Sequence, residues 1–337
     1  MGVVYGSLGR PSREMVLGPG VGLDNGVVSV GGGRVMIVTV DPVSVIPAFG
    51  AKLSAWLSVH LIASDYTSSG CDPEFATFTY NFPPEMARSE REEYVRSVGS
   101  ECDVLGVSIA GGHTGSYPGA GLTVIGSGTM FGFAKEGGYV DPSMAKDGDT
   151  ILVTKHAAIE ATLSLATAFP TFVEDRVGAS VARRARSSAR LCSTVADARA
   201  ARTIGLGEGG VTSMHDATEG GILGALGEMA SASKLRFAVS PDRIPVTPEA
   251  RAVCEVFGLD PLRTMGEGAL LITCGRPQVD RLIGVLRRAG VPAVEIGTIT
   301  RGRGLVATDP SGNMKPLPPG RDPYWKAYDQ GVKRRLR

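Results

Sequence analysis

The hydrophobic and polar positions of the chain alternate between short apolar runs and longer segments of helical periodicity. Apolar runs predict buried strands at residues 35–40, 104–109, 150–154 and 268–273. Strict alternation at 75–82 is typical of a half-buried strand, and further strands are predicted at 27–30, 122–133, 236–239 and 294–300. Helices are predicted over 48–64, 157–169, 248–257 and 277–289, and over the charged segments 83–101 and 172–201. Strands separated by helices indicate the α/β class.

One turn-rich, polar segment, residues 140–149, interrupts this alternation. A chain of 337 residues has the length of about two domains. We therefore expect a first domain over 1–148 and a second α/β domain over 149–315. Residues 316–337 are irregular and basic at their end, which predicts a basic tail or a short terminal helix.

The stretch 213–230 reads as a loop that enters an amphipathic helix. Asp216 is placed to be the N-cap, and Glu219, three residues later, completes a capping box. The same helix contains several glycines, each of which costs about 1 kcal/mol in a helix interior. These glycines are Gly220, Gly221, Gly224 and Gly227, and the spacing of Gly220, Gly224 and Gly227 forms one face without side chains. Either another element packs closely against this face, or the helix start binds an anion such as phosphate.

Composition excludes several classes of protein. The net charge of +1 gives no bulk attraction to nucleic acid or to a membrane surface. The five cysteines contain no CxxC pair, so neither a disulfide framework nor a zinc cluster is expected. No signal peptide is evident near Met1, and no apolar run is long enough to span a membrane, so we expect a cytoplasmic protein.

Three aspartates stand where a regular element meets a turn or a loop rich in glycine or serine: Asp24, Asp41 and Asp65. Either they are separate capping and turn residues, or they bind Mg²⁺ together with substrate phosphates. Glycines near them, such as Gly20 and Gly22, let phosphate oxygens approach backbone N–H groups. The sequence has neither a GxxxxGK[ST] phosphate loop nor a dinucleotide-binding GxGxxG between a strand and a helix.

His113 follows a predicted strand within a glycine turn that includes Gly111, Gly112 and Thr114. A lone histidine is more often structural, but an imidazole here can also donate to a phosphate oxygen or bind a metal. His215 directly precedes Asp216 and is placed to face the same anion as the helix start.

Seven ordered motifs resemble the aminoimidazole ribonucleotide synthetase (PurM-like) superfamily of ATP-dependent enzymes, over nearly all of residues 16–305. The motifs lie at residues 18–24, 39–41, 63–65, 111–114, 147–154, 215–221 and 266–271. The motif at 215–221 is most similar to the branch of the hydrogenase-maturation carbamoyl dehydratases. Thiamine-monophosphate kinase and selenophosphate synthetase are sister branches.

The resemblance implies two α/β domains with mixed sheets, the first of which pairs with its copy to make a dimeric β-barrel. It implies ATP and Mg²⁺ as cofactors, with Asp24, Asp41 and Asp65 as metal ligands. His113, His215 and Asp216 become candidate catalytic residues. The candidate cofactor-binding residues are Gly20, Gly22, Gly111, Gly112, Thr114, Gly220 and Gly221.

Departures from the family pattern limit what is carried over. The hydrogenase-maturation branch carries its substrate on a cysteine in a Pro-Arg-Ile-Cys tail, whereas the last cysteine here is Cys274. His113 stands where relatives often have an acidic metal ligand, and Glu219 where some relatives have a basic residue. We therefore expect a homodimeric ATP- and Mg²⁺-dependent enzyme that phosphorylates an amide, carbonyl or phosphate oxygen of a small molecule. The alternative is an inactive nucleotide-binding homologue in a maturation or regulatory assembly.

Overall fold

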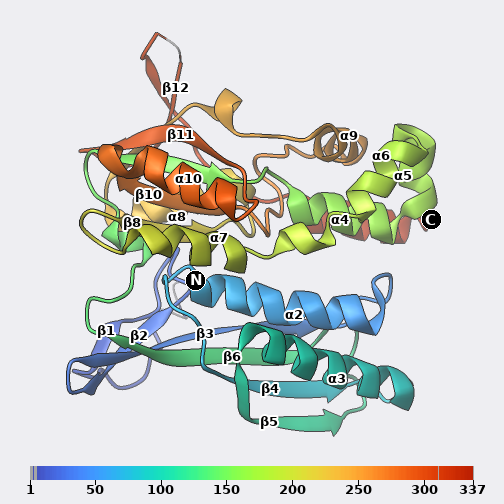
Figure 1. The fold of residues 1–337 in the computed structure, drawn as a ribbon. Coiled ribbons are helices and arrows are strands. Elements are labelled where there is room, and N and C mark those ends of the chain that lie inside the picture. Colours follow the sequence, from blue (N-terminus) through green and yellow to red (C-terminus); the bar gives the residue numbers. More distant parts are fainter. Residues whose placement is uncertain (1–2, 4–5, 310, 337) are drawn as a thin grey trace. The chain divides into compact units, whose positions relative to one another are not determined.

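The computed structural model describes residues 3, 6–309 and 311–336. By its internal contacts the chain divides into two compact units, Met1–Tyr139 and Val140–Arg337. Each unit is built around one mixed β-sheet with helices, so the α/β class with two mixed sheets is confirmed (Figure 1).

The first unit contains a six-stranded sheet in the order β1-β2-β3-β6-β4-β5. Neighbouring strands are antiparallel except β4 and β5, which are parallel and joined through helix α3. The elements are β1 Met15–Leu17, β2 Gly26–Gly31, β3 Arg34–Ser44, α2 Gly50–Thr67, β4 Phe75–Phe82, α3 Arg88–Leu105, β5 Ser108–Ser116 and β6 Val124–Lys135.

Helices α2 and α3 pack on the sheet of the first unit, and alternation along the strands decides which side chains they cover (Figure 1). In β4 the even-numbered side chains, from Ala76 to Phe82, are buried, while the odd-numbered ones are half-buried. The predicted strand at 75–82 is therefore confirmed. The predicted strand at 104–109 is confirmed only from Ser108, where β5 begins, because α3 continues to Leu105 and ends at the left-handed Gly106 (φ 79°).

The second unit contains a seven-stranded sheet in the order β13-β12-β9-β11-β7-β10-β8, antiparallel except for β12 and β9. Its strands are β7 Asp149–Thr154, β8 Val211–Asp216, β9 Arg236–Val239, β10 Leu270–Gly275, β11 Ala293–Thr300, β12 Gly304–Thr308 and β13 Met314–Pro316. Its α-helices are α4 Ile159–Ala168, α5 Pro170–Val177, α6 Ala179–Arg186, α7 Val195–Ala201, α8 Gly221–Ser233, α9 Pro248–Phe257, α10 Val279–Arg288 and α11 Tyr324–Lys333.

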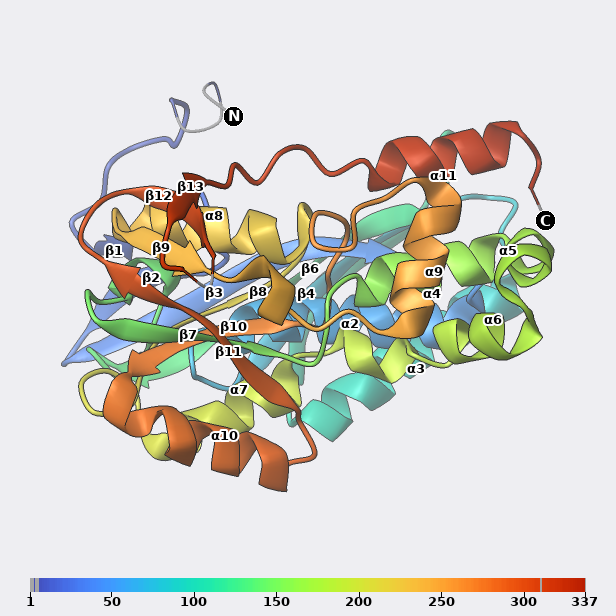
Figure 2. The ribbon, with the colours of Figure 1, turned by 90° about the horizontal axis from the view of Figure 1, so that it is seen from above.

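Two apolar clusters cover the opposite faces of this sheet, because neighbouring side chains of a strand point to opposite sides. Ile151 and Val153 of β7 pack with α8, whereas Leu152 between them packs with α7 and α10. Figure 2 shows α8 on one side of the sheet and α7 with α10 on the other. A third cluster joins α4, α5, α6 and α9 to the C-terminal helix α11.

The charged segment 172–201 is not one continuous helix. Gly178 (φ 83°) separates α5 from α6, and a 3-10 turn at Ala189–Cys192 precedes α7. No helix in the described part of the chain is both long and apolar enough to cross a membrane.

Candidate active site

The three aspartates of the first unit lie on segments that are hydrogen-bonded to one another. Asp24 is in the loop between β1 and β2, and its carbonyl oxygen accepts a bond of 2.9 Å from Thr39 Oγ1 of β3. The side chain of Asn25 donates to the carbonyl oxygen of Asp65 at 2.8 Å. The loop that carries Asp24 is thereby fixed to both β3 and the end of α2.

Asp41 and Asp65 occupy these two neighbouring elements. Asp41 follows Thr39 by two residues in β3, so both side chains point to the same face of the sheet. Asp65 lies in the last turn of α2, and both aspartates are half-buried. The expectation that a strand ends at Asp41 and a helix at Asp65 is wrong, because β3 runs to Ser44 and α2 to Thr67.

Asn25 adds an oxygen that sequence reasoning missed. Its amide nitrogen donates to Asp65 O and, at 3.2 Å, to Ser68 Oγ. Its Oδ1 is buried and has no hydrogen-bond partner among the described residues. A buried acceptor without a partner is costly, so it marks a place where a ligand completes the site. The only signal in the sequence is that Asn25 follows Asp24 in a glycine loop.

The candidate glycines of the first unit have different structural reasons. Gly22 is left-handed (φ 71°) within the tight turn in which Leu23 N donates to Gly20 O. At Gly112 an added Cβ would lie 2.2 Å from the carbonyl oxygen of Phe78, so strand packing alone requires glycine there. Gly111 and Thr114 lie on the same strand and pair with Thr77 and Tyr80.

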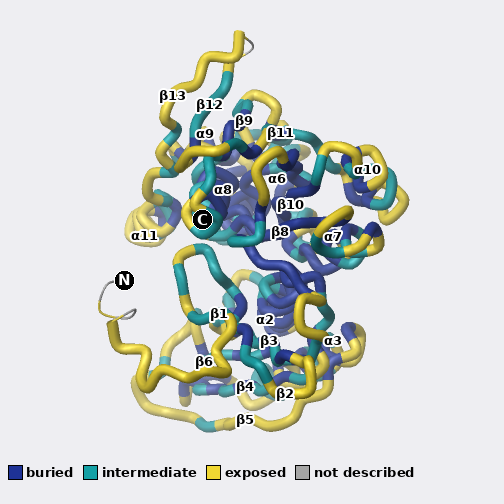
Figure 3. Tube along the Cα trace, turned by 90° about the vertical axis from the view of Figure 1, so that its left-hand side faces the viewer, coloured by how far each residue is buried: buried dark blue, intermediate teal, exposed yellow. Residues whose placement is uncertain are grey.

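His113 lies inside β5 and not in the expected glycine turn. It is exposed, pairs with Thr79 of β4, and its Nε2 is 2.6 Å from Tyr117 Oη. Strands β4 and β6 separate β5 from β3, which corresponds to about 14 Å at the usual spacing of strands. Within one copy of the unit, His113 therefore lies apart from Asp41. Figure 3 shows β5 as an exposed edge strand.

In the second unit, His215 and Asp216 are the last residues of strand β8 and are buried. They pair with Leu271 and Leu270 of β10, and His215 Nε2 lies 3.1 Å from Glu228 Oε2 of α8. The expected capping box is wrong, because Asp216 belongs to the strand. Helix α8 begins at Gly221, with the left-handed Gly220 (φ 83°) before it.

The glycines of α8 permit close packing by other parts of the second unit. At Gly221 an added Cβ would lie 2.7 Å from Thr264 O, and at Gly227 it would lie 3.0 Å from Pro319 Cγ. The first of the two explanations for the glycine face, close approach of another element, is therefore confirmed at Gly227.

The start of α8 also has a carboxylate from its own chain. Gly220 N donates to Asp322 Oδ2 at 2.9 Å, and Trp325 Nε1 donates to Glu219 Oε1 at 3.2 Å. The segment before α11 thus supplies the negative charge that a helix N-terminus favours. Glu219, which stands where some relatives have a basic residue, is thus held by the indole of Trp325.

Four of the five thiols of this chain have no nucleophilic character in the described structure. Cys102, Cys192, Cys254 and Cys274 are buried and form no disulfide. Burial raises the pKa of Cys102, Cys254 and Cys274 to about 12 and that of Cys192 well above its usual value. Because the thiolate is the reactive form, these residues are structural.

Comparison with known proteins agrees with this architecture. The model of the N-terminal domain of AIR synthase related proteins matches residues 22–134, and the C-terminal domain model matches 146–310. The carbamoyl dehydratase HypE of Rhizobium leguminosarum bv. viciae is 28% identical over 291 residues, which cover 82% of this chain and 77% of that protein.

Two solved structures show the same fold. The hydrogenase maturation protein HypE in complex with ATP has a TM-score of 0.68 and 22% identity, and the match covers 92% of this chain and 88% of that chain. ThiL complexed with AMPPCP and TMP has a TM-score of 0.70 and 16% identity, with 94% of both chains covered. Both domain models of one family thus occur here in order, and the fold agrees over most of the chain. The chain belongs to the AIR synthase related family, within the PurM-like superfamily.

Proposed function

We propose that this protein is an ATP- and Mg²⁺-dependent enzyme that phosphorylates an amide, carbonyl or phosphate oxygen of a small molecule. One observation carries the proposal: the segments of Asp24, Asp41 and Asp65 are hydrogen-bonded together, and buried Asn25 Oδ1 beside them has no partner among the described residues. The two similar structures are complexes with ATP and with AMPPCP, which supports a nucleotide as the ligand.

The residues present fit Mg²⁺, because the ion prefers oxygen ligands and uses one or two carboxylates together with phosphate oxygens. Asp24, Asp41 and Asp65 would hold it, and the orphaned amide oxygen of Asn25 extends the same donor set. When bound, Mg²⁺ neutralises charge on the transferred phosphoryl group.

The remaining roles are assigned from the resemblance to the superfamily. The backbone of the turn at Gly20 and Gly22 would bind nucleotide phosphates, and the Gly220–Gly221 turn would lie beside the acceptor. His215 and Asp216, buried at the end of β8, orient the acceptor oxygen or its proton. Gly111, Gly112, His113 and Thr114 on the edge strand contribute from the copy of the chain in a homodimer.

The homodimer is supported by the surface of the first unit. The face of its sheet opposite α2 and α3 carries exposed apolar side chains, Val40 at 63% and Val124 at 57% exposure. Strand β5 leaves one edge of the same sheet unpaired by any described strand. An exposed apolar face beside an open edge favours pairing with a second copy. Sedimentation equilibrium tests this, and a monomer at micromolar concentration contradicts it.

The decisive experiment measures nucleotide binding and turnover in the same preparations. We expect ATP to bind in the presence of Mg²⁺ and to bind weakly after chelation with EDTA. Asp41→Asn removes both Mg²⁺-dependent binding and release of ADP, whereas Asp103→Asn, on the exposed side of α3, changes neither. Unchanged binding and turnover in Asp41→Asn would sink the metal assignment.

The alternative function, a nucleotide-binding homologue without catalysis, rests on His113 at a position where relatives often have an acidic ligand. It predicts the same Mg²⁺-dependent binding and no release of ADP or phosphate with any of a panel of small-molecule amides, carboxylates and phosphate esters. Turnover above that of Asp41→Asn with any member of the panel excludes this alternative.

A further inference from the structure

Lys155, directly after strand β7, has a backbone conformation that side chains rarely adopt. Its φ is +54°, in the left-handed region that favours glycine. Such a conformation persists only where the surroundings determine it. The contacts of its side chain are therefore the place to look for a reason.

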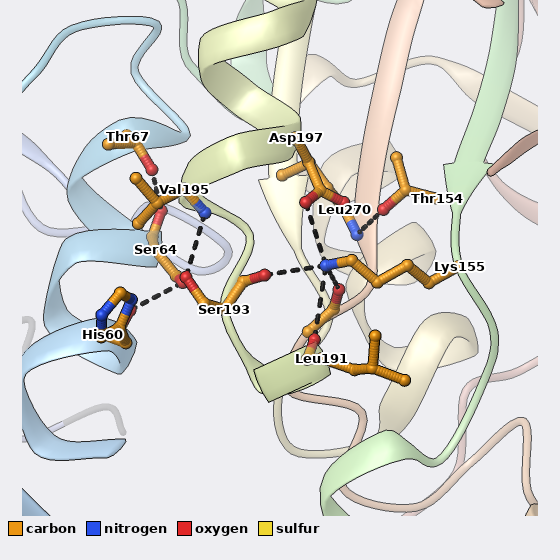
Figure 4. A network of polar contacts seen from close by, with 11 residues as sticks. His60, Ser64, Thr67, Thr154, Lys155, Leu191, Ser193, Val195, Asp197 and Leu270 are labelled. Carbon is orange, nitrogen blue, oxygen red and sulfur yellow. Dashed lines mark hydrogen bonds and ion pairs between the residues drawn. The ribbon is translucent and has the colours of Figure 1, made fainter. Parts of the chain in front are cut away.

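The ammonium group of Lys155 lies in a cage of four acceptors (Figure 4). Nζ donates to the carbonyl oxygens of Gly268 at 2.6 Å, Ser193 at 2.8 Å and Leu191 at 3.3 Å. It also lies 3.0 Å from Asp197 Oδ2 of α7. The exposed fractions of the Lys155 and Asp197 side chains are 8% and 1%, so little water competes for these contacts.

One of these acceptors, Gly268, belongs to the loop before β10. An added Cβ on Gly268 would lie 2.1 Å from Leu191 O, so the loop is pressed against the segment that also supplies the cage. Thr154 Oγ1, one residue before Lys155, accepts from Leu270 N at 2.9 Å. Lys155 holds the backbone at Gly268 and Thr154 holds it at Leu270, on the two sides of the point where the loop enters β10.

The same loop holds the end of β8, where the candidate catalytic residues lie. Ala217 N donates to Ala269 O at 2.8 Å, and Gly266 N donates to Thr218 O at 3.0 Å. In the ladder of β8 and β10, Asp216 pairs with Leu270. A continuous set of hydrogen bonds therefore leads from the Lys155 ammonium, through residues 266–270, to Asp216 and the residues that follow it.

We propose that Lys155 is a positioning residue, which sets the His215–Asp216 strand end by holding the loop at Gly266–Ala269. The catalytic consequence rests on the proposed function of His215 and Asp216, while the structural consequence does not. A simple stabilising ion pair would distribute its effect over the whole second unit. Positioning concentrates the effect on residues 216–218 and 266–270.

Amide hydrogen exchange of the full-length chain, read by mass spectrometry, separates these cases. Lys155→Met keeps the length of the side chain but removes all donors. We expect exchange at 216–218 and 266–270 to accelerate by about tenfold or more beyond the acceleration in strand β11, which reports the loss of stability of the second unit as a whole. Uniform acceleration across the second unit, or no change at 266–270, overturns the proposal.

Asp197→Asn is the matched variant, because it removes the charge of the pair and leaves the three carbonyl contacts of Lys155. We expect exchange at residues 266–270 to remain slow in this variant, even where its thermal stability falls. Equal acceleration at 266–270 in both variants would show that the ion pair acts through stability alone, which overturns positioning.

Measurement of ATP turnover tests the catalytic consequence of the proposal. Lys155→Met lowers kcat by about 100-fold, without a matching rise in KM for ATP, because the proposed Mg²⁺–ATP ligands lie in the first unit. If the unaltered protein shows no turnover with any acceptor, the proposed function fails, and the exchange experiment still decides whether Lys155 positions the loop. Turnover in Lys155→Met equal to that of the unaltered protein overturns the catalytic part.

Discussion

The carboxylates of the first unit and the carboxylate of the Lys155 cage are the same chemical group in opposite surroundings. Asp24, Asp41 and Asp65 are half-buried, and the Asn25 oxygen beside them has no partner among the residues described. Asp197 is buried against an ammonium that three carbonyl oxygens also surround. The Asn25 oxygen without a partner indicates ligand binding beside the first group of carboxylates, whereas the close ion pair of Asp197 with Lys155 indicates a structural role.

The largest expected difference concerns activity in the first region. On the proposed assignment, Asp65→Asn should lower ATP turnover by about 1,000-fold, because it removes a carboxylate that would hold the Mg²⁺ at the transferred phosphoryl group. Its melting temperature should stay close to that of the unaltered protein, since Asp65 is half-buried at a helix end. Phosphate release and differential scanning calorimetry measure the two effects, and a variant that unfolds without losing specific turnover would break the comparison.

At the Lys155 cage we expect a large loss of stability as the main effect. Lys155→Met leaves Asp197 buried without its cation, and breaking such a pair costs about 3 kcal/mol or more in the free energy of unfolding. Urea denaturation followed by circular dichroism measures this loss. Lys333→Met is the control. Lys333 pairs with Asp329 on the surface, so this change should lower the free energy of unfolding by less than about 1 kcal/mol. Equal losses would mean that the cage contributes no more than a surface pair.

Acidity should modulate the loss at the cage. Burial raises the pKa of Asp197 above its ordinary value, and Lys155 opposes that rise. A raised native pKa means that the contribution of Asp197 to stability is complete below its unfolded pKa and declines as pH rises through the native pKa. Without Lys155 the native pKa rises further, so the deficit of Lys155→Met is smallest in acid. It then grows by about 1.4 kcal/mol per pH unit until the variant's own native pKa is passed.

Denaturation of both proteins from pH 4 to 8 tests this dependence. In the background Asp197→Asn the cost of Lys155→Met should no longer vary with pH, because no carboxyl titrates there. A deficit that is constant with pH in the Asp197 background would show that lost packing, and not the unpaired carboxylate, is the cause.

The smallest expected effect belongs to Asp322, a carboxylate satisfied by one backbone group of α8 and one of its own segment. Asp322→Ala loses the bonds from Gly220 N and Tyr324 N and should cost about 1 kcal/mol, the usual value of a lost helix cap. Asp329→Ala is the matched control on α11. If Asp322→Ala is instead as costly as Lys155→Met, the helix start depends on its internal carboxylate far more than the partial exposure of Asp322 suggests.

Local pattern was sufficient for much of the fold. Strands β4 and β9 and helix α9 were predicted with the observed bounds, because their alternation, helical spacing and the Thr247 cap are encoded within each segment. The strand character of residues 211–216 was missed, because it depends on a ladder to residues 270–274. A capping-box pattern at Asp216 and Glu219 was the stronger local signal, and the tertiary pairing overrides it.

In the candidate site, too, some residues could be recognised from local sequence and others only from their distant partners. Its aspartates could be selected from the sequence, since acids beside glycine loops are uncommon outside turns and sites. Asn25 and Lys155 could not, because the meaning of each depends on partners 40 and 113 residues away. Nothing in the sequence around Lys155 indicates that its backbone is left-handed.

The segment that binds Gly220 through Asp322 also has a consequence for the order of synthesis. The first unit closes its sheet within residues 15–135, so its contacts are complete once that part of the chain has been made. The second unit needs Asp322 at Gly220 and Gly331 against Phe169, contacts that span 102 residues or more. The third cluster, which includes Phe169 and Tyr324, therefore stays uncovered until helix α11 has been made, and this is the interval in which a newly made chain is most exposed to aggregation.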